Sequence, residues 1–117
     1  MKIKLDIRPL SINQAWQGRR YKTKKYTQYC QDVSYLLGKY NQTTINDYCE
    51  ITYKFYLKNW KMTDGDNCVK CLQDILVKKQ VIKDDRFIMR YVIEKIPSEK
   101  DYIEIEINNI EKKGQNQ

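Results

Sequence analysis

Apolar and polar residues alternate along several parts of the chain, which is typical of strands with one buried face. The first part spans residues 2–8, and the longest begins at Tyr48 and runs to residue 57. Residues 87–93 and 102–107 are rich in aromatic and β-branched side chains, which favour strands. The pattern therefore predicts four strands. In the longest one, the predicted buried positions are Cys49, Ile51, Tyr53, Phe55 and Leu57.

Two other stretches follow the spacing of three and four residues that is typical of an amphipathic helix. The first covers residues 26–40, and Gly38 and Asn41 are predicted to mark its end. The second follows the segment KMTDGDN, where Asp66 or Asn67 is predicted to cap the helix. The predicted buried positions are Tyr26, Tyr29, Cys30, Val33, Leu36, Leu37 and Tyr40 in the first helix, and Val69, Leu72 and Leu76 in the second.

The elements follow the order strand, loop, helix, strand, helix, strand, strand, with no repeat and no break in composition. We expect an α+β fold: one small domain, residues 1–110, in which a mixed β-sheet packs against two helices. Residues 111–117 are expected to form a flexible tail. A chain of 117 residues is long enough to bury a core without disulfides.

Composition narrows the possible partners. The net charge of +7 favours polyanions such as nucleic acid. No stretch approaches the roughly 20 apolar residues of a membrane span. The start, MKIKLDIRPL, lacks the pattern of a signal peptide, so we expect a cytoplasmic protein with no membrane association.

The chain has no histidine, which removes the commonest general base and the commonest zinc ligand. The cysteines Cys30, Cys49, Cys68 and Cys71 are expected to be reduced thiols. Cys68 and Cys71 form only half of a zinc motif, so no zinc site is expected. Any catalysis would rest on carboxylates, lysine, tyrosine or a metal ion.

Residues 16–26 form the most basic part of the chain and are expected to form a loop. This loop joins basic and aromatic side chains, which suits phosphate contact together with stacking on unpaired bases. The alternative is an ordinary solvated basic loop. Its candidate DNA contacts are Trp16, Arg19, Arg20, Tyr21, Lys22, Lys24 and Lys25.

Asp64 and Asp66 flank one glycine at the start of the second predicted helix. In an extended backbone, two such carboxylates point the same way and can share one divalent ion. Mg²⁺ prefers oxygen ligands and usually takes one or two carboxylates. The alternative is that both residues only end a strand and cap a helix. A calcium loop of the EF-hand type is excluded, because Val69 and Ile75 occupy the positions of its glycine and glutamate.

Lys70 lies one helical turn after Asp66 and one turn before Asp74, so we expect the three side chains to share one helix face. Either the three side chains form a solvated row of ion pairs, or Lys70 contacts the scissile phosphate of a nucleic acid. Asp84 and Asp85 precede a strand, and they are either solvated or a source of a third metal ligand.

Together, Asp64-Gly65-Asp66-Asn67, Lys70, Asp74 and the pair Asp84-Asp85 resemble the signature of the RusA family of Holliday-junction resolvases. The resemblance extends to Pro9-Leu10-Ser11-Ile12-Asn13 with Trp16, and to Tyr21-Lys22-Thr23, so it covers nearly the whole chain. The combination of DxDN, a lysine and a later acidic pair is much more specific than any one part.

The resemblance implies a homodimeric RusA-like fold that resolves four-way DNA junctions by symmetric paired nicks, with Mg²⁺ or Mn²⁺ as cofactor. It implies that Asp64, Asp66 and Asp85 are metal ligands and that Lys70 is an essential basic residue beside them. Asn67, Asp74 and Asp84 are further candidates, and Asn13 joins the predicted DNA contacts. A protein of this kind and size would suit DNA recombination, DNA repair or a phage or prophage.

Two other functions stay open from the sequence. The first is a non-catalytic module that binds branched or single-stranded DNA, in which the acidic residues are structural. The second is a magnesium enzyme acting on nucleotides or phosphorylated small molecules. The second is disfavoured because the chain has no phosphate loop of the GxxxxGK[ST] type.

Overall fold

The computed structural model describes residues 1–17, 21–40 and 43–110. Its main sheet has four strands in the order β1-β6-β4-β5. β4 runs antiparallel to β6 and parallel to β5, and β1 runs antiparallel to β6. The predicted mixed sheet is therefore confirmed. The strands are β1 (Lys2–Leu5), β4 (Cys49–Leu57), β5 (Ile88–Pro97) and β6 (Tyr102–Asn109).

The long strand β4 alternates between buried and partly exposed residues along its whole length, as predicted. β1 is shorter than predicted, because the chain turns after Leu5 and the Ile7 N–H donates to the Leu5 carbonyl. β5 is longer than predicted and reaches Pro97, because it pairs with β4 as far as Leu57.

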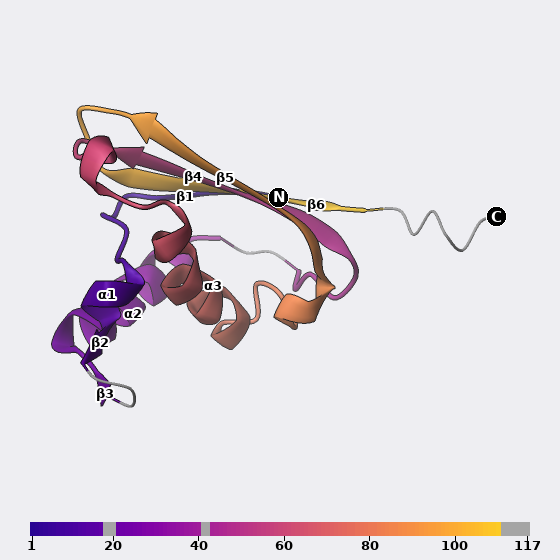
Figure 1. Ribbon diagram of the computed structural model, residues 1–117. Helices are drawn as coiled ribbons and strands as arrows, with labels where there is room; N and C mark the ends of the chain where they lie inside the picture. Colours follow the sequence, from indigo (N-terminus) through magenta and orange to yellow (C-terminus); the bar gives the residue numbers. More distant parts are fainter. Residues whose placement is uncertain (18–20, 41–42, 111–117) are drawn as a thin grey trace.

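The helices lie on one side of the sheet (Figure 1). They are α1 (Ile12–Ala15), α2 (Lys24–Leu37) and α3 (Val69–Lys78). α2 begins before the predicted Tyr26, because the Thr23 side chain caps it by accepting from the Tyr26 N–H at 3.2 Å. α2 ends at Gly38 as predicted, whereas Asn41 lies outside the described residues. Short 3₁₀ helices occur at η1 (Trp60–Met62), η2 (Asp66–Cys68) and η3 (Asp85–Phe87).

The prediction of a loop over residues 16–26 is wrong. The strands β2 (Trp16–Gln17) and β3 (Tyr21–Lys22) pair in a small antiparallel hairpin, and Lys24 already belongs to α2. Two-residue strands are too short to produce a period of two, so the sequence pattern did not indicate them. Arg19 and Arg20 lie outside the described residues, as does the predicted tail.

The core fills the space between the sheet and the helices. Of the positions predicted to be buried in the first helix, Tyr26, Tyr29, Val33 and Leu37 are buried. Cys30, Leu36 and Tyr40 are only partly buried, and Tyr40 lies beyond the end of α2. Within the described residues, none of the helices has the length and apolar character required to cross a membrane. The largest fully buried side chains include Ile51, Tyr53, Phe55, Leu72, Ile75, Leu76, Ile103, Ile105 and Ile107.

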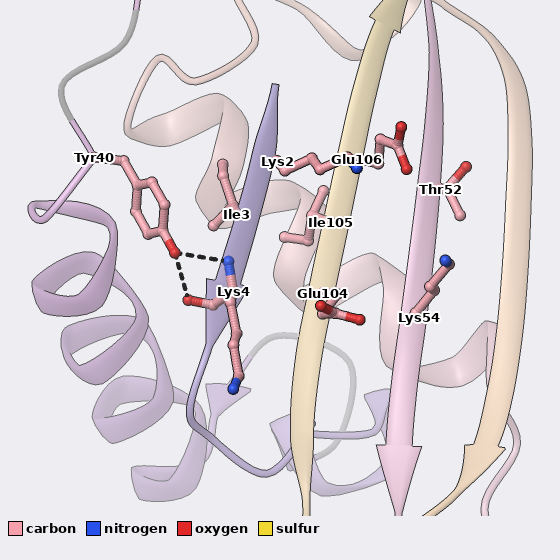
Figure 2. Close-up of a pocket in the computed structure, with 9 residues that line it drawn as sticks. All are labelled: Lys2, Ile3, Lys4, Tyr40, Thr52, Lys54, Glu104, Ile105 and Glu106. Atoms are coloured by element: carbon pink, nitrogen blue, oxygen red, sulfur yellow. Dashed lines mark hydrogen bonds between the residues drawn. The ribbon is translucent and has the colours of Figure 1, made fainter.

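The free edge of β1 is covered by one side chain. The Tyr40 hydroxyl accepts from the Lys4 N–H at 2.8 Å and donates to the Lys4 carbonyl at 3.0 Å (Figure 2). An exposed strand edge offers such groups to other chains, and proteins commonly block it. Tyr40 therefore protects β1 from pairing with a further strand at Lys4.

The sheet face opposite the helices carries balanced charge. A hollow of about 190 Å³ lies beside Tyr40 (Figure 2). In the register of the sheet, Lys4 and Lys54 both pair with Glu104. Because opposite charges alternate across neighbouring strands, this face is not the basic surface that DNA binding requires.

The protein is expected to lose stability at alkaline pH, because the pKa values of two tyrosines are raised in the folded state. The hydrogen bond to Glu104 raises the pKa of Tyr56 to about 12, and burial raises the pKa of Tyr26 to about 12. Both values lie above 10.0, the ordinary value of a tyrosine, so the folded state holds these protons more tightly than the unfolded state does. Their contribution is complete below pH 10 and is lost as the pH rises through 12.

Urea unfolding at a series of alkaline pH values should therefore show a midpoint that falls above pH 10. The matched variant Tyr56→Phe should show a shallower fall, since phenylalanine has no proton to lose. Equal slopes for the two proteins would contradict a role for Tyr56.

Candidate active site

The loop that carries the acidic motif is anchored on β5. The Lys95 ammonium donates to the carbonyl oxygens of Trp60 at 2.7 Å and Thr63 at 2.8 Å. A Cβ atom at Gly65 would lie 3.3 Å from the Cγ2 atom of Ile93. The loop therefore packs directly on the strand, and a larger residue at position 65 would push them apart.

Asp64 and Asp66 are both exposed. The prediction that an extended backbone between them points both carboxylates the same way is wrong. Gly65 has φ −61° and ψ −41°, which is a helical and not an extended conformation. Asn67 instead contacts both carboxylates. Its side-chain amide donates to Asp64 Oδ2 at 3.4 Å, and its N–H donates to Asp66 Oδ1 at 3.1 Å.

The predicted helix cap is also absent. In the described part of the chain, no side chain caps η2 or α3. The Asp66 carboxylate accepts only from the neighbouring Asn67 N–H among the hydrogen bonds of this loop. Asp66 therefore keeps most of its oxygen lone pairs exposed, which favours a ligand role over a capping role.

Cys68 lies beneath the two carboxylates. Its thiol donates to the Asp64 carbonyl at 3.6 Å. Burial raises the pKa of Cys68 to about 11, and the negative charges of Asp66 and Asp64 add to the rise. The thiol therefore stays protonated at neutral pH and supports the loop rather than acting as a nucleophile.

A polar cavity of about 240 Å³ brings Asp64 and Asn67 together with Asn13, which lies far away in the sequence. Asn13 belongs to α1 and was a predicted DNA contact. The sequence analysis did not select the other polar residues of this cavity as site residues, because three of them lie within predicted or quoted segments without a sign of a shared site and two lie outside any motif. They are Arg8, Ser11, Gln14, Asn59 and Thr63.

A second group forms around Lys70. Its ammonium lies 3.0 Å from Asp74 Oδ1, which confirms the predicted pair. Asp74 raises the pKa of Lys70, and Asp85 adds to the rise, so Asp85 also lies near this lysine. No ion pair in the described ranges joins Lys70 to Asp66, so the predicted row of three is only partly formed. Asp74 and Asp85 also line a cavity of about 470 Å³ together with Tyr26.

The neighbouring residues Asp84 and Asp85 have different surroundings. Asp84 accepts from the Arg86 N–H at 2.9 Å and from Arg86 Nε at 3.0 Å. These bonds lower the pKa of Asp84 and fix the start of η3. Asp85 is exposed and lines the same cavity as Asp74, the partner of Lys70. Asp85 is therefore the member of the pair that is available for a ligand.

The arrangement of Asp64, Asp66 and Asp85 agrees only in part with a site for a divalent metal ion. No three His, Cys, Asp or Glu side chains of the described residues are arranged to hold a metal. The predicted set of Asp64, Asp66 and Asp85 is therefore not assembled as one cluster. Two exposed carboxylates on one anchored loop still match Mg²⁺, which usually takes one or two carboxylates and leaves positions for water and phosphate.

The predicted DNA contacts that the structure describes lie in α1, in β2 and β3, and at the start of α2. Lys24 and Lys25 are exposed at the first turn of α2, next to Tyr26 of the Asp85 cavity. The backbones of Trp16, Tyr21 and Lys22 belong to the β2-β3 hairpin. Arg19 and Arg20 lie outside the described residues.

Comparison with known proteins identifies the family. The family model for Endodeoxyribonuclease RusA matches residues 9–108, which include both acidic groups and α1. The chain therefore belongs to the RusA endodeoxyribonuclease family. Membership implies a nuclease that acts on branched DNA. No curated protein matches the chain.

Proposed function

We propose that this chain is a divalent-metal-dependent endonuclease that resolves four-way DNA junctions by symmetric paired nicks. The observation that carries the proposal is the exposed pair Asp64 and Asp66 on an anchored loop, within the region that the family model matches. Asn13, near the start of the matched region, lines one cavity with Asp64.

Asp64 and Asp66, joined by Asp85, would hold Mg²⁺ or Mn²⁺. When bound, such an ion lowers the pKa of water and offsets the charge of the phosphate. Asn67 orients both loop carboxylates through its amide and its N–H. Because Asp74 raises its pKa, Lys70 stays protonated at neutral pH and offers a positive charge to a phosphate.

The basic residues at and before α2 would bind the arms of the junction. Lys24 and Lys25 offer exposed charges for phosphate. We propose the same role for Asn13, Arg19, Arg20 and Lys22, and stacking on unpaired bases for Trp16 and Tyr21. Two symmetric cuts require two sites, so we propose that the chain acts as a homodimer.

One observation favours a second candidate function. The three proposed carboxylate ligands do not form a cluster in the described residues. A module that binds branched or single-stranded DNA without cutting it would have no need of that cluster. Cleavage itself separates the two functions.

The test uses a labelled four-way junction with the wild-type protein and Asp66→Asn, in Mg²⁺ or in a chelator, with linear duplex as control substrate. We expect paired nicks of the junction only in Mg²⁺, little cutting of the duplex, and binding without cutting by Asp66→Asn. Tight junction binding with no cutting by the wild type in Mg²⁺ or Mn²⁺ would establish the binding module instead.

A further inference from the structure

The large apolar side chains that are exposed on the described part of the chain are not scattered. Five of these six belong to η1, just before the acidic loop, or to β5, the strand on which that loop packs. In η1, Met62 is 81% exposed and Trp60 is 37% exposed. A single exposed apolar residue needs no explanation, whereas several that gather beside a candidate active site indicate a surface for a partner.

Met62 lies at the candidate active site itself. It lines the polar cavity of about 240 Å³ together with Asp64 and Asn13. Only Thr63 separates Met62 from Asp64 along the chain. The reaction at a phosphate has no need of an apolar group, so the side chain of Met62 fits another part of the substrate. The apolar part of a DNA strand is its bases, which offer their ring faces for stacking.

The turn that carries these side chains is fixed from both sides. The Met62 N–H donates to the Asn59 carbonyl at 3.2 Å, and Thr63 Oγ1 donates to the same carbonyl at 2.9 Å. From β5, the Lys95 ammonium holds the carbonyls of Trp60 and Thr63. Figure 1 shows this turn directly after β4, beside the end of β5. A fixed backbone lets an exposed side chain press between stacked bases, because the turn does not fold away from them.

Charge favours nucleic acid over a protein as the occupant of this turn. Lys61 lies between the two apolar residues in the chain and is exposed. Its ammonium lies 5.4 Å from the centroid of the Trp60 ring. Positive charge next to apolar and aromatic side chains suits a DNA strand, in which phosphates and bases alternate.

We infer that Met62 and Trp60 form an apolar wedge that inserts between the bases at the branch point of the DNA, beside the scissile phosphate. Apolar side chains such as methionine unstack base steps in this way. Unstacking costs free energy, and it costs least where pairing or stacking is already interrupted. The wedge therefore favours a branch point over a linear duplex. The inference rests on the proposed function and deepens it, because it names residues that select the substrate.

A four-way junction with the fluorescent base analogue 2-aminopurine at its branch point tests the wedge without cutting. This analogue is quenched while it is stacked and brightens when it is unstacked. In a chelator, saturating wild-type protein should brighten the probe, whereas saturating Met62→Gln should leave it close to the free junction. Met62→Leu keeps an apolar side chain and should brighten the probe as the wild type does. The control Tyr35→Gln changes another exposed side chain, 75% exposed on α2, and should also behave as the wild type.

Affinity measures the same contact. Met62→Gln and Trp60→Gln should each raise the dissociation constant of the junction roughly tenfold, a typical effect of losing one stacked base. The dissociation constant of a linear duplex should change little, because the wedge does not open a continuous stack. Since Met62 is exposed, Met62→Gln should keep the wild-type midpoint in urea unfolding, which separates lost binding from lost folding.

The inference is overturned if saturating wild-type protein leaves the probe quenched, or if Met62→Gln brightens it as much as the wild type does. Loss of brightening in Met62→Leu, or an equal loss in Tyr35→Gln, would also overturn it. Failure of the proposed function gives a different result: the wild-type protein would brighten the probe in a chelator but leave the junction uncut in Mg²⁺. Cutting without brightening would overturn the wedge alone.

Discussion

Replacing Asp85 with asparagine is expected to lower the rate of junction cleavage at least about a hundredfold, since even the outer partners of metal ligands commonly change activity by 10–100-fold. Asp85 is exposed and lies near Lys70, so its carboxylate is available to the proposed ion. The matched variant Asp84→Asn is expected to keep most of the activity. Asp84 is already engaged by Arg86 and holds the start of η3.

Single-turnover cleavage of a labelled junction, with saturating protein and Mg²⁺, measures this difference. Binding of the junction in a chelator should be similar for both variants, because the change affects the reaction and not the DNA contacts. A large loss in Asp84→Asn with little loss in Asp85→Asn would reverse the two roles.

Gln73→Leu is expected to lower the free energy of unfolding by about 1–3 kcal/mol, the cost of leaving a buried polar group unpaired. Gln73 is 9% exposed and links α3 to the sheet. Its carbonyl accepts from the Tyr53 hydroxyl at 3.0 Å, and its amide donates to the Tyr91 hydroxyl. Without Gln73, the fully buried Tyr53 hydroxyl has lost its partner.

A double-mutant cycle with Tyr53→Phe measures this pairing by urea unfolding. The double variant removes both partners, so its loss of stability should be smaller than the sum of the two single losses. Additive losses would show that the bond between Tyr53 and Gln73 contributes little, and that the single variants act through packing.

The elements with strong periodicity were predictable. In β4, all five positions predicted to be buried are buried, namely Cys49, Ile51, Tyr53, Phe55 and Leu57. The strand lies between two neighbouring strands, and the helices cover the face to which these side chains belong. The pairing of Trp16–Gln17 with Tyr21–Lys22 was missed, since two paired residues on each side leave no period in the sequence. Local pattern identifies an element only when the element is long enough to repeat.

The candidate site was predictable in its residue types and not in its geometry. The spacing of Asp64 and Asp66 indicated a shared ligand, but the sequence did not show that Gly65 has a helical conformation and packs against Ile93 of β5. The separation of Asp84 from Asp85 depends on where Arg86 folds back. The meeting of Asn13 with Asp64 comes from packing across the chain, and only the family resemblance had grouped them.

The single hydroxyl of Tyr40 has a consequence for how far the sheet can grow. By taking both the N–H and the carbonyl of Lys4, it leaves β1 with no complete pair of groups for a new strand at that residue. An open strand edge is a template on which further chains add and aggregate. Tyr40 therefore limits growth of the sheet from the β1 side, and its single hydroxyl protects the protein against aggregation at Lys4.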